Sequence, residues 1–232
     1  MCGRYTITTP SDVVADLFDL AYAADYQPRY NVAPTQEAPL VRVFEETGAS
    51  GVETTARRLD LVRWGLVPFW ADDPSIGNRL INARAESARD KPSFRDSFKK
   101  RRCLVVADGY YEWKKEKEGK QPHWFHRPGG EPFAFAGLWS RWDKAKDEPP
   151  LDTFTILTMD ASPEVRPIHH RMPVVLPKDA YAAWLDPGLQ EKGAVQEILG
   201  RAVGDGWEVR RVSRRVNNPG NDLPEVLREM ED

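Results

Sequence analysis

A chain of 232 residues, with 41% hydrophobic and 30% charged residues, can bury a substantial core as one large domain or two small ones. No run of 18 apolar residues is present, which excludes a transmembrane helix, and the first residues lack the charged and apolar regions of a secretion signal. The net charge of −3 argues against general nucleic-acid binding, and only two cysteines, Cys2 and Cys103, favour a reducing, cytoplasmic compartment over a disulfide scaffold.

The charges are unevenly distributed along the chain. Basic residues gather at 99–102 and at 210–215, and further arginines lie between Trp70 and Cys103. Acidic residues concentrate at 143–148 and in the tail, 225–232. This layout permits a phosphate-binding face on an acidic protein, although solvated surface charge explains any single run more simply.

The first half of the chain predicts short strands, one helix and several loops. The predicted strands are residues 2–8, 39–44 and 54–63. Apolar residues from Val13 to Leu20 recur at helical spacing, and Ser11 is the expected N-cap of that helix. Residues 45–53 are expected to form a glycine-containing turn and residues 71–78 a loop.

The second half predicts more strands than helices. The predicted strands are residues 103–107, 123–126, 133–138, 153–159, 174–176 and 207–212, with a solvated turn at 114–120. Short helices are expected at 179–185 and at 190–199, the latter closing on Gly200, and a helical turn at 223–230. Because βαβ alternation and linkers are absent, we expect a single α+β domain over residues 1–232 with a mainly antiparallel sheet system, closed or sandwiched.

Cys2 carries a distinctive chemistry if Met1 is removed. It then bears a free α-amine and a thiol on neighbouring carbons, with pKa values near about 7.7–8.0 and about 8.5. The amine can attack an aldehyde to form an imine, and the thiol can then close a five-membered thiazolidine ring. Position alone does not establish this role, because many chains have a small second residue and a frayed terminus.

Three polar residues are candidates to assist such a thiol. Glu112 lies among aromatic residues at the end of a buried-looking strand, where burial would raise its pKa for proton transfer; a strand-end surface glutamate fits equally well. His169, in a loop closed by a proline, is either an acid–base group or a satisfied structural histidine. Asn82 would hold a substrate oxygen or the amino terminus, although buried asparagines more often bond the backbone.

Aromatic residues offer a further signal, whereas metal and cofactor motifs are missing. Phe69 and Trp70 enter a polar loop next to the arginine-rich segment, which suits stacking on unpaired bases, while most tryptophans are expected in the core. The spacing of His123 and His126 falls on a strand, and there is no CxxC pair, phosphate-binding glycine loop or GxSxG elbow. We therefore expect no metal, no cofactor and no serine hydrolase.

Several motifs occur in a fixed order along nearly the whole chain. They are Met1-Cys2-Gly3-Arg4-Tyr5, Arg29-Tyr30-Asn31-Val32-Ala33-Pro34, Trp64-Gly65-Leu66-Val67-Pro68, Asn82-Ala83-Arg84-Ala85-Glu86, Asp108-Gly109-Tyr110-Tyr111-Glu112-Trp113, His169-His170-Arg171-Met172-Pro173 and Val212-Ser213. Together they make the chain resemble the SRAP family, the SOS response-associated peptidases, also described as abasic-site processing proteins. His170 stands where the family often has an acidic residue, and the key positions otherwise match.

The resemblance implies a β-rich α+β domain with a positively charged groove for single-stranded DNA. It implies removal of Met1, proposed to be autocatalytic, and a thiazolidine crosslink between Cys2 and the ring-opened sugar aldehyde of an abasic site. Asn82 would position the terminus and the sugar, Glu112 would transfer protons, and His169 would handle the deoxyribose hydroxyl during ring opening or crosslink reversal. The implied DNA contacts are Arg4, Arg84 and Arg171 on phosphates and Phe69 and Trp70 on bases.

Two other functions remain open at this point. A thiol peptidase using Cys2, His169 and Glu112 would cleave other proteins without DNA. A noncovalent module for single-stranded DNA would bind in a salt-sensitive way and be indifferent both to abasic sites and to Cys2→Ala. In the favoured interpretation the protein is a DNA-associated cytoplasmic monomer with no membrane partner.

Overall fold

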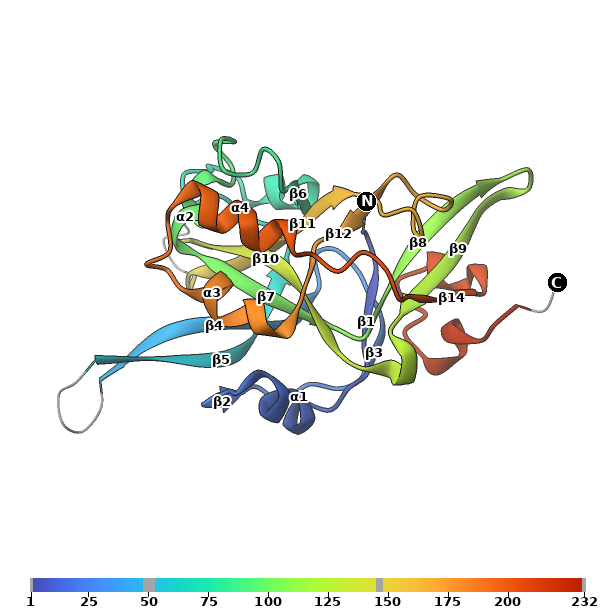
Figure 1. Cartoon of the computed structure of the whole chain (residues 1–232), viewed down its shortest axis with the longest axis horizontal. Helices are drawn as coiled ribbons and strands as arrows, with labels where there is room; N and C mark the ends of the chain where they lie inside the picture. The colour runs from blue at the N-terminus through green and yellow to red at the C-terminus, as the bar shows by residue number, and fades with distance from the viewer. Residues whose placement is uncertain (1, 48–52, 145–147, 231–232) are drawn as a thin grey trace.

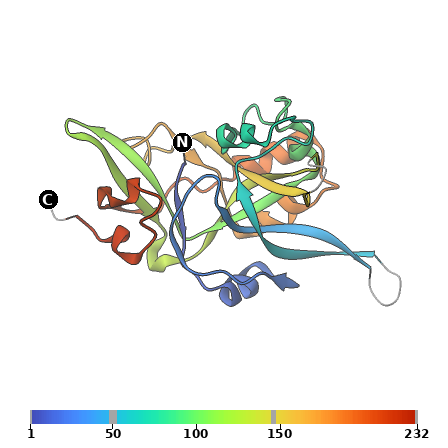
Figure 2. The same cartoon turned by 180° about the vertical axis from the view of Figure 1, so that it is seen from behind.

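The computed structural model describes residues 2–47, 53–144 and 148–230, which form two β-sheets and several short helices. The sheets lie side by side along the long axis of the molecule, and the N-terminus lies near the place where they meet (Figure 1). The view from behind shows the same junction (Figure 2).

The smaller sheet is antiparallel and contains the N-terminal strand. Its strands, in spatial order, are β14 (Glu208–Arg211), β9 (Gly119–His126), β8 (Gly109–Glu116), β1 (Tyr5–Ile7) and β3 (Arg29–Val32). β8 and β9 form a hairpin whose tip extends away from the rest of the molecule (Figure 1).

The larger sheet has nine strands and provides most of the scaffold. Its main path runs β12 (Arg171–Pro173), β11 (Leu151–Asp160), β10 (Phe133–Trp142), β7 (Arg102–Ala107), β4 (Glu37–Thr47), β5 (Glu53–Trp64) and β2 (Tyr22–Ala23). β13 (Val175–Leu176) pairs with β10, and β6 (Asn82–Arg84) runs parallel to β11. Most pairings are antiparallel, so the predicted α+β class with a mainly antiparallel sheet system is confirmed.

The helices are short; the α-helices lie around the larger sheet, and the last two 3₁₀ turns contact the smaller one. They are α1 (Ser11–Phe18), α2 (Arg95–Lys100), α3 (Tyr181–Leu185) and α4 (Lys192–Gly200), with 3₁₀ turns η1 (Pro74–Arg79), η2 (Pro128–Gly130), η3 (Lys178–Ala180), η4 (Arg214–Asn217) and η5 (Pro224–Leu227). α2, α3 and α4 gather at one end of the sheet, and α1 lies apart from them beside β2 (Figure 1).

The hydrophobic core joins the two sheets through aromatic rings. Tyr5 on β1 packs against Trp64 and Phe135 of the larger sheet, with ring centroids 5.3 and 5.9 Å apart. Tyr110 on β8 meets Phe135 edge-on at 6.2 Å. Burying a side chain such as Phe135 is worth roughly 1.5–3 kcal/mol. These contacts therefore fix the junction beside which the N-terminus lies.

Asp108 marks the point where the chain passes from β7 in one sheet to β8 in the other. Its buried carboxylate accepts hydrogen bonds from Thr6 Oγ1 at 2.6 Å, from Thr8 N at 2.5 Å and from Thr9 N at 3.0 Å. The next residue must be glycine, because a Cβ on Gly109 would collide with the indole of Trp124. Asp108 thus sets the register of β1 on β8 and with it the position of the residues before β1.

Some local predictions were wrong in detail. Pro10, not Ser11, is the N-cap of α1: its backbone is extended, with ψ of 150°, and the helix begins at the next residue. The Ser11 hydroxyl donates to Asp25 instead. The expected turn at 114–120 is shorter, since β8 runs to Glu116 and β9 begins at Gly119. β4 and β5 likewise extend into the predicted 45–53 turn, whose residues 48–52 lie outside the described residues.

Candidate active site at the N-terminal cysteine

Cys2 lies beside the junction of the two sheets. The backbone N–H of Tyr111 on β8 donates to Arg4 O at 3.0 Å, which holds the start of the chain against β8. The Cys2 side chain is fully buried, and its Sγ lies 3.8 Å from Arg4 O, within reach of a weak sulfur hydrogen bond. Burial, together with the nearby charge of Glu112, raises the pKa of the Cys2 thiol well above its usual range. The thiol therefore stays protonated at neutral pH unless a base accepts its proton.

Asn82 holds the backbone of the same residue. Its Nδ2 donates to Cys2 O at 2.7 Å, from a position on β6 where Asn82 pairs with Ile156 of β11. Asn82 was expected either to hold a substrate oxygen or the amino terminus, or simply to bond the backbone. The structure shows a backbone hydrogen bond, and the backbone group belongs to Cys2. Asn82 Oδ1 is buried, and no donor among the described residues reaches it. That oxygen is an acceptor at the site.

Glu112 is buried in the middle of β8, where its side chain is only 2% exposed. The alternative of a strand-end surface glutamate is therefore wrong, because β8 continues past it and the junction covers it. Burial raises the pKa of Glu112 to about 7. Near neutral pH the carboxyl group exists in both protonation states, which is the condition for general acid–base work.

His169 lies in the loop between β11 and β12, next to Glu112. Its Nδ1 is 3.8 Å from Glu112 Oε1 and 3.0 Å from the backbone oxygen of Arg171, to which an Nδ1–H donates; in that tautomer Nε2 is the acceptor. Burial lowers the pKa of His169, and the charge of Lys120 acts in the same direction. The imidazole is therefore neutral at pH 7 and available to accept a proton.

A pocket of about 390 Å³ opens beside this group. It is lined by Glu112, Trp113, Lys120, His169 and Asn217. The buried Cys2 does not line it. Glu112 connects the two, because it lines the pocket while its charge acts on the Cys2 thiol.

The three candidate phosphate-binding arginines differ in availability. Arg84 is exposed at the end of β6. Arg171 is nearly buried and donates to both oxygens of Glu86 at 2.8 and 3.0 Å and to Asp160 at 2.7 Å. Arg4 donates to the backbone oxygen of Val216 at 2.6 Å and to other acceptors around it. Arg84 is therefore the most exposed of the three, Arg4 is half-buried and Arg171 is buried.

Phe69 and Trp70 are exposed, in contrast to fully buried tryptophans such as Trp64 and Trp184. The exposed fractions are 50% for Phe69 and 43% for Trp70. Phe69 lines a hollow of about 310 Å³ together with Asp96, Lys99, Lys100 and Arg101. The structure does not include either aromatic residue in the pocket lined by Glu112 and His169.

Sequence reasoning missed Lys120 and Asn217 as pocket residues. Lys120 lies on β9, at the end of the segment 114–120 that was expected to form a solvated turn. Asn217 lies near the C-terminal end of the chain. The only feature of the sequence that could have pointed to it is its place shortly after the Val212-Ser213 motif. Trp113 follows Glu112 directly and could have been found from that adjacency.

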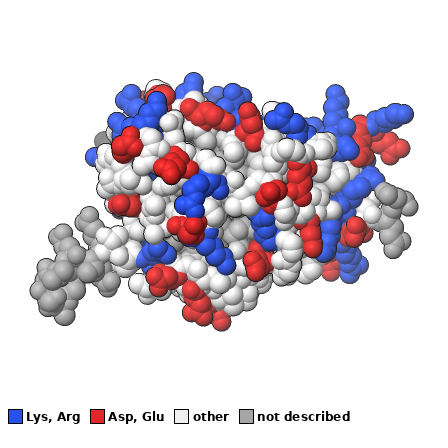
Figure 3. All heavy atoms as spheres, in the orientation of Figure 1, with Lys and Arg blue, Asp and Glu red and all other residues white. Residues whose placement is uncertain are grey.

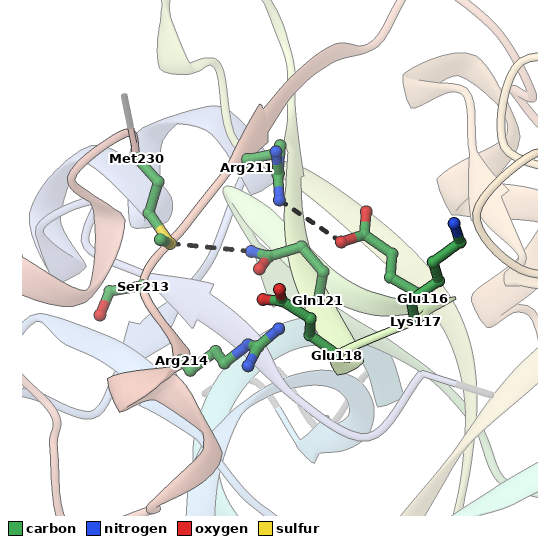
Figure 4. Close-up of a pocket in the computed structure, with 8 residues that line it drawn as sticks. All are labelled: Glu116, Lys117, Glu118, Gln121, Arg211, Ser213, Arg214 and Met230. Carbon is green, nitrogen blue, oxygen red and sulfur yellow. Dashed lines mark hydrogen bonds and ion pairs between the residues drawn. The ribbon is translucent and has the colours of Figure 1, made fainter. Parts of the chain in front are cut away.

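A larger pocket of about 600 Å³ lies farther along the same hairpin (Figure 4). It is lined by Glu116, Lys117, Glu118, Gln121, Arg211, Ser213, Arg214 and Met230. Arg211 pairs with Glu116 at 3.4 Å, and Gln121 Nε2 lies 3.9 Å from the Met230 sulfur. None of the predicted site residues is among them, and charges of both signs face the hollow.

The charged side chains are unevenly distributed over the face of the molecule shown in Figure 3. Lys and Arg side chains are frequent along the upper edge of the molecule and around the β8–β9 hairpin, while Asp and Glu dominate near α1 (Figure 3). Among the described residues, no group of three or more His, Cys, Asp or Glu side chains is placed to hold a metal ion. Within that same part of the chain, no helix has the length and apolar character needed to cross a membrane.

Comparisons with known proteins point to one family. A family model described as SOS response associated peptidase (SRAP) matches residues 1–219. The chain is 38% identical over 231 residues to the abasic site processing protein YoaM of Bacillus subtilis, covering 98% of this chain and 97% of that one. It is 33% identical to the abasic site processing protein HMCES of Gallus gallus, covering 87% of this chain and 66% of the relative. A crystal structure from Bacteroides thetaiotaomicron shares the fold, with a TM-score of 0.84 at 24% identity over 99% of this chain and all of that one.

Proposed function

The chain belongs to the SOS response associated peptidase (SRAP) family, and from this membership we propose that it acts on abasic sites in DNA, by a covalent crosslink through Cys2. The names of its relatives, abasic site processing proteins, support the repair role. The crosslink and the residue roles that follow are what the resemblance to this family implies, and the residues around Cys2 support them.

The observation that carries the proposal is that Asn82 and Glu112 both act on Cys2 and that His169 lies next to Glu112. Asn82 binds the Cys2 carbonyl at 2.7 Å, and Glu112, whose pKa is about 7, is close enough to act on the Cys2 thiol. His169 lies 3.8 Å from Glu112. A terminal amine and thiol at this place would have both a holding group and proton-transfer groups within reach.

The crosslink forms in two steps after Met1 is removed. The α-amine of Cys2 attacks the sugar aldehyde, and the resulting carbinolamine loses water to give an imine, with protonated Glu112 supplying the proton to the departing hydroxyl. The thiol then adds to the imine carbon, and its proton ends on the nitrogen. The net change is the loss of one water. Glu112 is the natural carrier of these protons because it takes both protonation states near pH 7.

His169 acts earlier, on the sugar. An abasic deoxyribose is mostly a closed ring, and opening it to the aldehyde breaks the C1′–O4′ bond as a proton moves from the C1′ hydroxyl to O4′. A neutral imidazole in the pocket can accept that proton, because burial lowers the pKa of His169. The same group can return a proton during reversal of the crosslink.

The DNA contacts are assigned by exposure. Arg84 would hold a phosphate, and Phe69 and Trp70 would stack on unpaired bases. Arg4 and Arg171 reach phosphates only by exchanging their present acceptors, so their first role here is to position the terminus and the His169 loop. The proposal also includes single-stranded DNA as substrate, a monomer, residues 1–232 as one domain, and removal of Met1 by the protein itself.

A thiol peptidase acting on other proteins is the less favoured alternative. A nucleophilic cysteine of that kind needs access to a peptide and a lowered pKa. Cys2 is fully buried and its pKa is raised. A small aldehyde reacts first with the amine, so the thiol needs neither access to a peptide nor a lowered pKa.

The experiment uses single-stranded DNA with one abasic site and looks for a heat-stable adduct on a denaturing gel. The mature protein is expected to form the adduct, and Cys2→Ala is expected to form none. DNA with a tetrahydrofuran analogue, which has no aldehyde, is the matched substrate control. An adduct that persists in Cys2→Ala or forms equally on the analogue contradicts the proposal.

A further inference from the structure

Two polar side chains of the pocket lined by Glu112 and His169 have no part in the proposed proton transfers. Lys120 comes from β9 and Asn217 from the end of η4, and both line the pocket with Glu112 and His169. The pocket volume of about 390 Å³ lies in the range that holds small ligands. It has room for more than the reacting aldehyde carbon.

Asn217 is held in one orientation. Trp113 Nε1 donates to Asn217 Oδ1 at 2.8 Å. An indole N–H can only donate, so the atom facing it must be the amide oxygen, and the two hydrogens on Nδ2 point elsewhere. Asn217 therefore offers a fixed donor rather than an acceptor to whatever binds in the pocket.

The backbone that carries Asn217 is fixed as well. Arg4 Nη2 donates to Asn217 O at 3.2 Å. The Asn31 side chain donates to the backbone oxygens of Val216, Asn218 and Asn221 at 3.0–3.1 Å. Arg4 is two residues from Cys2, so the same guanidinium links the reactive terminus to the segment that carries Asn217. The donor is thus pre-organised relative to Cys2.

Lys120 provides a positive charge beside the pocket. It is exposed on β9, and it lies close enough to His169 for its charge to act on the imidazole. A substrate anion in this pocket would be repelled by Glu112 whenever that carboxyl is ionised. A neighbouring ammonium offsets the repulsion, and an ammonium with an amide N–H is a common pair for phosphate oxygens.

We propose that Lys120 and Asn217 form a subsite for the phosphodiester group that flanks the reacting sugar. This rests on the proposed function for the identity of the ligand. The subsite holds the sugar from its phosphate side while C1′ reaches Cys2. Lys120 supplies the charge and Asn217 the directional hydrogen bond. Both are binding residues for the substrate and take no part in breaking or forming bonds.

The test measures noncovalent binding to a single-stranded oligonucleotide containing the tetrahydrofuran analogue. One flanking phosphate at a time is replaced by an uncharged methylphosphonate. Wild type is expected to lose about five- to tenfold in affinity at one of the two positions, the size expected for one charge-assisted contact. Lys120→Gln and Asn217→Ala are expected to bind the unmodified DNA correspondingly weaker and to lose little more on methylphosphonate substitution. The salt slope of Lys120→Gln should fall by about 0.7.

Two further variants sharpen the test. Asn217→Asp keeps an oxygen for Trp113 but places a negative charge in the subsite, so it should bind more weakly than Asn217→Ala. Lys192→Gln on α4 removes the same charge from an exposed helix position and should keep the full methylphosphonate effect. Thermal unfolding of each variant checks that the fold is retained.

The outcomes separate this subsite from the proposed function. If both pocket variants keep the full wild-type loss at both flanking phosphates, the subsite is disproved even where the Cys2 adduct forms. If the pocket variants lose the sensitivity to methylphosphonate substitution but no adduct forms on an intact abasic site, the subsite stands and the crosslink fails. The analogue has no aldehyde, so the binding result does not depend on the chemistry of Cys2.

Discussion

Two glutamates on the same strand show how the fold brings the pKa of one of them close to neutrality. Glu112 and Glu116 lie four residues apart on β8, so strand alternation directs both to the same face of the sheet. Glu112 lies at the sheet junction, is 2% exposed and has a pKa raised to about 7 by burial. Glu116 lies near the hairpin tip, with a side chain 31% exposed and paired with Arg211.

The comparison shows that the position of a glutamate along the strand decides how far its carboxyl group is buried, and with it the pKa of that group. The larger pocket surrounds Glu116, whereas the smaller one surrounds Glu112. Size therefore does not identify the reactive site. The smaller pocket is lined by a desolvated carboxyl group and a neutral histidine, and the charge of that carboxyl acts on the buried Cys2 thiol, which are the conditions for proton transfer.

The largest expected effect comes from removing the acid–base group. Glu112→Gln keeps the shape but cannot exchange a proton, so adduct formation with abasic single-stranded DNA should slow by about 10²–10⁴-fold. Single-turnover gel kinetics measure this rate. Glu116→Gln is the matched control on the same strand and should react at the wild-type rate. Equal slowing by both variants would erase the distinction between the two glutamates.

Burial of Glu112 should also make the free energy of unfolding depend on pH. A carboxyl with a pKa near 4.3 when unfolded and about 7 when folded binds its proton more tightly in the native state, so stability falls as pH rises between these values. Above pH 7 the full cost is on the order of 3 kcal/mol, and Glu112→Gln avoids it. Denaturant unfolding at pH 8 should find Glu112→Gln more stable than wild type. At pH 4 this gain should vanish, and a gain that stays constant with pH would contradict the raised pKa.

The pH profile of the reaction gives a third comparison. The step in which Glu112 donates a proton should weaken as pH rises through about 7, while the amine gains reactivity toward its own pKa near about 8. Adduct rates measured from pH 5 to 9 should therefore pass through a maximum in wild type. Glu112→Gln should lose the inflection near pH 7. A wild-type inflection that survives in this variant would assign it to another group.

A smaller effect is expected at Asn82. Asn82→Ala removes the hydrogen bond to the Cys2 carbonyl, and losing one such bond is worth about 1 kcal/mol, or roughly five- to tenfold in rate. The loss should appear in adduct formation and leave noncovalent binding of the tetrahydrofuran analogue unchanged. Weaker binding with an unchanged rate would show that Asn82 holds DNA and does not position the terminus.

Arg84 should give the smallest change. Arg84→Gln removes one exposed charge, so the salt slope of single-strand binding should fall by about 0.7 with a modest loss of affinity. The rate at saturating DNA should stay the same. A slope equal to that of wild type would remove Arg84 from the set of phosphate contacts.

The sequence was sufficient for the fold class, because short β-rich segments without βαβ alternation favour antiparallel sheets. It was also sufficient for the exposure of Phe69 and Trp70, which follow a proline into a polar loop. It could not decide between a surface and a buried Glu112, because that depends on how two sheets meet. The partners of Arg171 come from β11 and the turn after β6, and Asn217 comes from a segment over 100 residues from Glu112. Such long-range pairings leave no local pattern.

The central claim is tested most directly by the intact mass of the product formed with abasic single-stranded DNA without borohydride. The account predicts a species equal to the protein lacking Met1 plus the DNA minus one water, with the link mapped to Cys2. A product that retains Met1, a link through a lysine, or no covalent species at all would contradict it.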